Sequence, residues 1–164
     1  MEFELKTERI DLSMWEESDA AWYRQLVGER GVQRGVDMPT LDAARGKVIS
    51  LRDRAVESGI ALLTIRRRDA GDFIGYCGLI IGRSTLEEPG IAYELFRRAH
   101  RHGYATEAAS VVLDAAIGTG RRRLWSTVRA WNVASFRVLE KLRFERHHST
   151  WDERGELVWN VRDV

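Results

Sequence analysis

The stretch from Ile91 to Ala108, IAYELFRRAHRHGYATEA, carries most of the information about the fold. Its apolar start is typical of a buried strand, its middle is a loop rich in arginine and histidine, and Gly103 opens an alanine-rich helix. Small residues at a helix start let the backbone approach a ligand closely, and the free amides there favour a phosphate. From the residues alone, two interpretations remain: an anion-binding strand–loop–helix and a solvated basic loop.

The elements on either side of this stretch predict one α+β domain over residues 1–164. Hairpins connect most of the strands, and one strand–helix–strand unit spans residues 90–130. That combination is typical of a mixed, mostly antiparallel sheet packed against helices. The predicted strands are residues 3–15, 60–65, 73–81, 90–96, 124–130, 144–150 and 156–161, and the predicted helices are residues 20–27, 41–58, 103–117 and 134–142.

A second informative segment, NVASFRVLEKLRF, runs from Asn132 to Phe144. It resembles the Asn-x-Ala-Ser-x-x-Val-Leu-Glu-Lys-x-Gly-Phe motif of the GNAT acetyltransferases, and residues 103–108 resemble the helix opening of the same superfamily. Residues 5–10, LKTERI, resemble the first strand of its RimJ/RimL branch, the ribosomal-protein alanine N-acetyltransferases. Because two separated motifs agree with the predicted order of elements, the chain is identified as a GNAT member by resemblance.

The resemblance implies a sheet of seven strands flanked by about four helices, a site for acetyl-CoA, and no metal. In the family the pantetheine arm lies between the fourth and fifth strands, here residues 91–96 and 123–129. The pyrophosphate is held by backbone amides at the start of the following helix. The residues that the resemblance assigns to acetyl-CoA are Leu95, Phe96, His100, Arg101, His102, Gly103, Tyr104, Ala105, Thr106, Asn132 and Ser135.

Three positions depart from the family motifs. His100 stands where the family has Gln or Arg, which removes one side-chain contact to the pyrophosphate but leaves the backbone amides. Arg143 stands where a glycine usually ends the helix with positive φ, so we expect a different or strained cap. Leu139 stands where many relatives carry a tyrosine that protonates the leaving thiolate, so that acid is missing.

Acetyl transfer needs a base, because a lysine-like amine has a pKa of about 10.4 and is protonated at neutral pH. Glu94 is the first candidate, since the resemblance places it beside the thioester; the alternative is a surface carboxylate. His147 and His148 are second candidates, or simply face solvent. Ser135 is either a donor to the leaving sulfur or a hydroxyl bonded to the helix start, and Asn132 is either a pantetheine contact or a helix cap.

The acceptor pocket is expected in the variable parts: the glycine-rich segment 28–39, read as a mobile loop, the two N-terminal helices, and the last hairpin. The arginine triplets 66–68 and 121–123 are read as solvated turns, with the second as an alternative contact for the 3′-phosphate of CoA. The aromatic residues expected within reach of this pocket are Trp15, Trp22, Tyr23, Trp131 and Trp151.

Composition limits the class of protein further. Lys plus Arg is 26 and Asp plus Glu is 25, a net charge of +1 that gives no argument for nucleic acid or membrane binding. The single cysteine, Cys77, reads as core rather than as an acyl carrier. The charged N-terminus, MEFELK, lacks the apolar core of a signal peptide, and no apolar run approaches the ~20 residues of a membrane span, so we expect a cytoplasmic protein.

Three functions are compatible with these features. The first is an acetyl-CoA-dependent N-acetyltransferase acting on a peptide N-terminus or a small primary amine by direct attack in a ternary complex. The second is an acyl-CoA-binding sensor or partner module with little catalysis. The third, a basic RNA-binding domain using the arginine triplets, is disfavoured by the near-zero net charge. A homodimer is common in the family, and an exposed strand edge would permit one.

Overall fold

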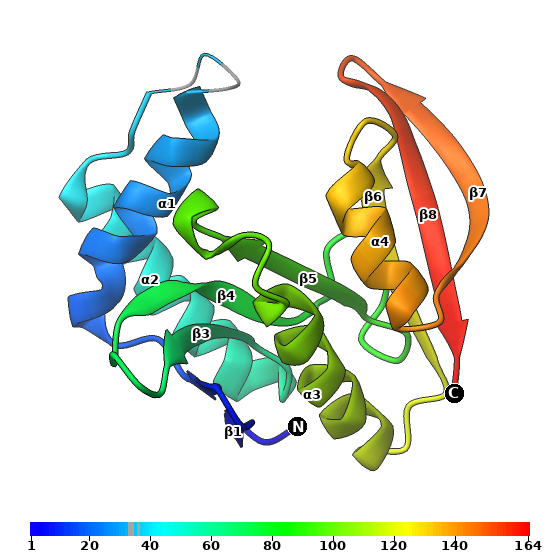
Figure 1. Cartoon of the computed structure of the whole chain (residues 1–164), viewed down its shortest axis with the longest axis horizontal. Helices are drawn as coiled ribbons and strands as arrows, with labels where there is room; N and C mark the ends of the chain where they lie inside the picture. The colour runs from blue at the N-terminus through cyan, green and yellow to red at the C-terminus, as the bar shows by residue number, and fades with distance from the viewer. Residues whose placement is uncertain (33–34, 36) are drawn as a thin grey trace.

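The computed structural model describes residues 1–32, 35 and 37–164. Its eight strands form one sheet in the order β1-β2-β3-β4-β5-β6-β8-β7, antiparallel except for the β5–β6 pair (Figure 1). The α+β class and the mixed sheet are therefore confirmed. The strands are β1 (Glu4–Lys6), β2 (Ile10–Ser13), β3 (Leu62–Arg67), β4 (Phe73–Ile80), β5 (Gly90–Leu95), β6 (Arg123–Arg129), β7 (Glu145–Asp152) and β8 (Gly155–Asp163).

The eighth strand arises because the first predicted strand is two. Residues 3–15 were expected to form a single strand, but a turn after Lys6 reverses the chain, and β1 pairs with β2. The Thr7 amide donates to the Ile10 carbonyl at 3.0 Å, which closes this turn. The polar run from Lys6 to Arg9 was the available signal, because a buried strand would not place four polar residues in a row.

Four α-helices and two short 3-10 helices, η1 (Glu17–Asp19) and η2 (Arg97–Ala99), connect these strands among the described residues. As predicted, Thr40 caps α2, accepting from the Ala43 amide at 3.1 Å, and Gly59 ends it in the left-handed conformation. Among the described residues, no helix combines the length and apolar character that a membrane span needs. The helices are α1 (Ala20–Val32), α2 (Leu41–Ser58), α3 (Tyr104–Gly118) and α4 (Val133–Lys141).

The end of α1 corrects one prediction. The helix was expected to stop at Val27, with Gly28 starting a loop that extends to residue 39, yet it continues to Val32. Gly28 is buried because Met38 packs where its side chain would be, with a Met38 carbon 2.6 Å from the position of a Cβ. The glycine permits close packing here and does not break the helix. Positions 33, 34 and 36 of the predicted loop lie outside the described residues.

Two apolar clusters fill the two faces of the sheet. The larger one joins α3 and α4 to the sheet and includes Cys77, Ala108 and Leu139, each at most 1% exposed. The smaller one joins α1 and α2 to the opposite face, with Trp15 and Phe73 at its centre. These two layers place α3 and α4 on one side of the strands and the N-terminal helices on the other.

The sheet divides between β5 and β6. Among the described residues, these parallel strands are in register only at Gly90 opposite Trp125, after which they diverge. Figure 1 shows the consequence: β6, β8, β7 and α4 form one arm of the molecule, and the remaining strands with α1, α2 and α3 form the other. On β4, Gly75 supports this course of β5, because a Cβ there would lie 2.1 Å from the Glu94 carbonyl oxygen.

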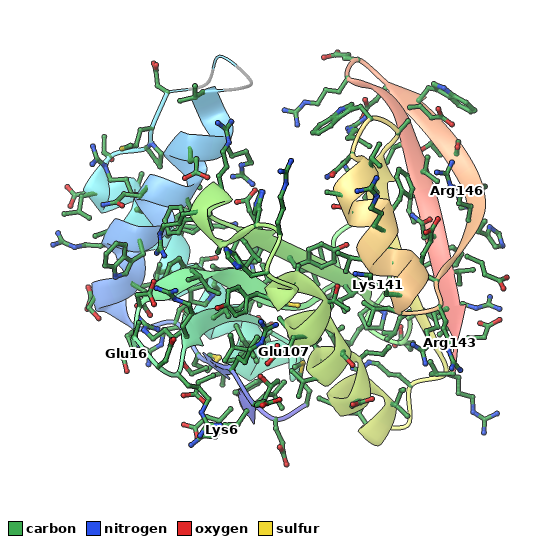
Figure 2. The ribbon with its side chains drawn as sticks, in the orientation of Figure 1. Lys6, Glu16, Glu107, Lys141, Arg143 and Arg146 are labelled. Atoms are coloured by element: carbon green, nitrogen blue, oxygen red, sulfur yellow. The ribbon has the colours of Figure 1, made fainter. Side chains whose placement is uncertain are left out.

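The end of α4 confirms the strained cap expected from Arg143. Its φ is 62°, in the left-handed region that normally suits glycine, and Figure 2 marks its place beyond α4. The Arg143 amide donates to the Glu140 carbonyl at 3.0 Å, and the Phe144 amide donates to the Leu139 carbonyl at 2.9 Å. The chain therefore keeps the hydrogen bonds of a glycine cap while bearing its conformational cost.

The R143G variant is expected to have a free energy of unfolding about 0.5–1 kcal/mol higher than the parent, because glycine adopts this conformation without strain. Part of that gain is lost, since glycine also raises the entropy of the unfolded chain. The matched control is R137G in the exposed middle of α4, which should cost about 1 kcal/mol. Urea unfolding of both variants measures the two changes. A destabilised R143G variant would contradict this account of the cap.

Candidate active site

The loop before α3 has the backbone geometry of an anion site. Arg101 and Gly103 both have left-handed backbones, with φ of 63° and 80°. Gly103 is the N-cap of α3 and, having no side chain, leaves the amides of the first helical turn without a side-chain cap. Amides gathered by such a turn and a helix N-terminus form a concave cradle for phosphate oxygens. The residues of the cradle are Arg101, His102, Gly103, Tyr104, Ala105 and Thr106.

Arg9 clamps this loop from the β1–β2 turn. Its Nη1 donates to the His102 carbonyl at 2.9 Å, its Nε donates to Glu107 Oε2 at 2.7 Å, and its guanidinium lies 4.6 Å from the Tyr104 ring centroid. Burial opposes ionisation of Glu107, but hydrogen bonds from Thr7 and Arg9 outweigh it and lower the pKa of Glu107. Figure 2 places Glu107 on α3. This role of Arg9 was not predicted from the sequence, because its partners His102 and Glu107 are far away in the chain.

The basic residues at the start of the loop are occupied within the protein. Arg98 donates to Asp72 Oδ2 at 2.7 Å and to the Phe73 carbonyl at 2.6 Å. The Arg97 amide donates to Glu29 Oε1 of α1 at 2.6 Å. His100 Nε2 lies 3.0 Å from the Leu95 carbonyl oxygen, so in this structure its ring contacts the end of β5. These contacts hold the loop in place.

The pairing of β5 with β4 shows which backbone groups of β5 face β6. The Phe96 amide donates to the Ile74 carbonyl at 2.9 Å, so every second residue counted back from Phe96 directs its amide and carbonyl to β4. Tyr93 and Leu95 therefore direct theirs towards β6. Phe96, expected to contact pantetheine, uses both backbone groups inside the protein, since its carbonyl accepts from the Ala99 amide at 2.9 Å.

Glu94 lies on the face of β5 that α1 covers. Its Oε2 is 3.4 Å from Arg30 Nη1, and its side chain is 21% exposed. Tyr76, its partner on β4, and Tyr23 of α1 lie beside the same ion pair. Burial raises the pKa of Tyr23, with Arg30 opposing this and Glu94 adding to it. The structure thus gives Glu94 a half-buried cationic and aromatic environment.

The start of α4 brings Asn132 and Ser135 to the divergence. Asn132 is the N-cap of α4, and its side-chain oxygen accepts a hydrogen bond from the Ser135 amide at 3.3 Å, in agreement with the helix-cap interpretation. The Tyr93 hydroxyl donates to the Ser135 carbonyl at 3.2 Å, and burial raises the pKa of Tyr93 to about 12. Leu139 is 1% exposed inside the larger apolar cluster, so its position contributes no proton donor.

A cavity of about 350 Å³ lies between the diverging strands β5 and β6, and several of the predicted site residues line it. Glu94, Asn132 and Ser135 line it together. His147 and His148 do not line it: their Nδ1 atoms are 2.8 Å apart on the exposed edge strand β7, where both rings lie against Trp125. They lie behind its wall, because both rings contact Trp125 and the His148 ring stacks on Trp159, and these two tryptophans line the cavity.

The predicted aromatic walls are partly wrong. Trp15 is 1% exposed and belongs to the smaller core cluster, where its Nε1 donates to the Leu62 carbonyl. Trp22 stacks on Phe73, and Trp151 is 71% exposed on β7. Trp131 does line the cavity, together with Trp125 and Trp159, which the sequence analysis did not single out.

The two arginine triplets lie in different places relative to the cradle, and Arg67 of the first has a side-chain hydrogen bond with Tyr104. Residues 121–123 follow the C-terminal end of α3, roughly 21 Å from its first turn along the helix axis, so the structure gives no support to a contact with the 3′-phosphate. Arg66 pairs with buried Asp19, Arg67 with Asp72, and Arg68 with Asp11. The triplet 66–68 therefore connects the sheet to neighbouring elements and is more than a solvated turn.

Comparison with known proteins agrees with this geometry. Residues 9–145 match the family model of the acetyltransferase (GNAT) domain, and the chain therefore belongs to the GNAT family of N-acetyltransferases. Protein YkkB of Bacillus subtilis is 34% identical over 90 residues, which span 51% of this chain and 50% of that protein. The chain thus spans about half the length of the curated relative that it matches.

Solved structures share the fold over almost the whole chain. RimL, the ribosomal L7/L12 α-N-protein acetyltransferase in complex with coenzyme A, has a TM-score of 0.83 at 14% identity, with 96% of each chain covered. The ribosomal-protein-S5-alanine acetyltransferase from Vibrio fischeri has a TM-score of 0.82 at 14% identity, covering 99% of this chain and 97% of that one. At these identities the likeness is one of fold, and it includes the branch suggested by the sequence.

The R9A variant is expected to bind CoA about tenfold more weakly, because the cradle then has to be ordered by the ligand itself. R45A on the exposed surface of α2 is the matched control and should bind as the parent does. Calorimetric titration with CoA gives both dissociation constants, and circular dichroism checks that both variants are folded. Unchanged affinity in R9A would show that the clamp does not organise the cradle.

Proposed function

We propose that this protein transfers the acetyl group of acetyl-CoA to a primary amine, a peptide N-terminus or a small amine, by direct attack in a ternary complex. The observation that carries the proposal is the cavity at the β5–β6 divergence, which Glu94 lines from one arm and Ser135 from the other. The cradle of backbone amides before α3 lies at the end of the same strand. Fold, cradle and cavity together support an enzyme with two substrates.

The residues present fit acetyl-CoA. Tyr93 offers its strand-edge amide and carbonyl, and Leu95 offers its amide, to the two amide groups of a pantetheine arm, as a missing neighbouring strand would. The backbone of residues 101–106 offers donors to a pyrophosphate without needing the side chain of His100. When bound, acetyl-CoA supplies an activated acyl group as a thioester.

The side chains of this chain then divide the proton transfers. Glu94 accepts a proton from the ammonium form of the acceptor, directly or through a water molecule, so that the amine attacks in its neutral form, and Arg30 Nη1 lies 3.4 Å from Glu94 Oε2. Ser135, at the start of α4, donates a hydrogen bond to the leaving sulfur, in place of the tyrosine that Leu139 replaces. Backbone donors on the free edge of β5 stabilise the developing oxyanion.

A covalent acyl-enzyme has no support in this site. Cys77 is fully buried, and its burial raises the pKa of the thiol, which leaves it without access or nucleophilic character. The same observation favours direct attack.

An exposed edge strand, β7, is the proposed surface for a homodimer, and a cytoplasmic location is part of the proposal.

A second candidate function is an acyl-CoA-binding sensor or partner module. The burial of Leu139 favours it, because the position that carries a general acid in many relatives contributes only to the core here. The two functions share the cofactor and differ in turnover.

Calorimetry with acetyl-CoA, followed by release of free thiol across a panel of peptides and small amines, separates the candidates. The enzyme predicts binding and thiol release with at least one amine class, with the product confirmed by mass. Binding without thiol release on any amine would favour the sensor. Absence of acetyl-CoA binding would contradict both functions.

The E94Q and S135A variants are each expected to lower kcat by roughly 10²-fold, the usual loss when a proton-transfer group is removed. E57Q on the exposed face of α2 is the matched control for the loss of a carboxylate and should retain parental kcat. Single-turnover rates with the best amine of the panel measure the chemical step. If kcat is retained in E94Q or S135A, the role assigned to that residue is wrong.

A further inference from the structure

The charged residues that line the cavity are unevenly distributed. Three are arginines, Arg83, Arg129 and Arg154, and one is a carboxylate, Glu94. Arg129 is the last residue of β6, and Arg154 lies in the turn between β7 and β8, at the top of the right-hand arm in Figure 1. The cations therefore come mainly from the arm opposite to the one that carries Glu94.

Asp152 interacts with all three arginines. Arg129 binds it through two hydrogen bonds of 2.7 and 2.8 Å, and Arg154 donates its backbone amide to Asp152 Oδ1 at 2.8 Å. The hydrogen bonds from Arg129 are the main reason that the pKa of Asp152 falls to about 2, and the charge of Arg83 acts in the same direction. Asp152 is therefore ionised throughout the working range of an enzyme.

Asp152 forms an ion pair with only one of the three guanidinium groups, that of Arg129. Arg129 and Asp152 account for each other and tie the hairpin to β6. Among the described residues, neither Arg83 nor Arg154 forms an ion pair within 4.0 Å, so both leave positive charge at this end of the cavity. On the opposite arm, the charge of Glu94 is already matched by Arg30.

Like charges gathered at one place repel each other, and an anion bound between them lowers that repulsion. Three tryptophans line the same cavity. The site therefore combines a carboxylate on β5 with arginine side chains that have no ion-pair partner among the described residues. That arrangement complements a molecule carrying both an amine and an anionic group.

We propose that the acetyl acceptor is such a molecule: a primary amine with a carboxylate or phosphate a few bonds away, held by Arg83 and Arg154. This inference rests on the proposed function and specifies its acceptor. Stabilisation of the hairpin accounts for the Arg129–Asp152 pair and for the Arg154 amide, but it leaves the guanidinium groups of Arg83 and Arg154 without an ion-pair partner among the described residues.

Paired acceptors of matched shape test the inference. We would compare the dipeptide amides alanyl-aspartyl amide and alanyl-asparaginyl amide, and phosphoethanolamine with ethanolamine, at equal concentrations of neutral amine. The anionic member of at least one pair is expected to have a kcat/KM roughly 10- to 100-fold higher, the range of a charged hydrogen-bonded contact. The R83A/R154A double variant should bring that ratio close to one, whereas R52A, an exposed arginine of α2, should preserve it.

The outcomes are separable. Turnover with equal or higher kcat/KM for the neutral members would overturn the inference and leave the proposed function intact. A preference for the anionic members that survives in R83A/R154A would also overturn the assignment to these arginines. If acetyl-CoA binds but no member of the panel releases thiol, the proposed function fails, and the acceptor inference fails with it.

Discussion

The parallel contact between β5 and β6 ends almost where it begins, and the functional features of the molecule follow from that. Beyond Gly90 and Trp125 the two strands separate, which leaves the backbone groups of Tyr93 and the amide of Leu95 directed into the space between them. A strand-like ligand could pair with this edge. Under the proposed function, that ligand is a pantetheine arm with its own amide groups. The same separation opens the cavity that Glu94 and Ser135 share.

The loop before α3 shows how side chains and backbone divide their roles. Arg9, Arg98 and His100 bind protein groups, and through these contacts they fix the course of the chain. The proposed anion cradle consists of amides, whose position depends on the left-handed backbones of Arg101 and Gly103. Under that proposal, His100 is compatible with the family motif. A loop with several basic residues looks like an electrostatic site in the sequence, yet the Arg98 guanidinium binds Asp72 and the His100 ring contacts the Leu95 carbonyl oxygen.

The sequence predicted most of the fold because hydrophobic periodicity and glycine signals report local structure. It failed at Gly28, where a glycine permits packing against Met38 and the helix continues, and at the first strand, where a polar run was not read as a turn. The cradle at the start of α3 was expected from its motif and stays a prediction, which the left-handed backbones of Arg101 and Gly103 support. The sequence did not predict which face of β5 Glu94 lies on, because its partner Arg30 comes from a helix 64 positions earlier in the chain. Trp125 and Trp159 likewise meet only through strand pairing.

The single cysteine has a consequence for the redox behaviour of this protein. Cys77 is fully enclosed in the core, and its raised pKa keeps it as a neutral thiol. In the solved RimL complex, by contrast, a cysteine forms a disulfide with coenzyme A. Oxidants, alkylating reagents and CoA disulfides all require a thiolate that they can reach. The chain therefore carries no accessible thiol that could form a mixed disulfide with CoA.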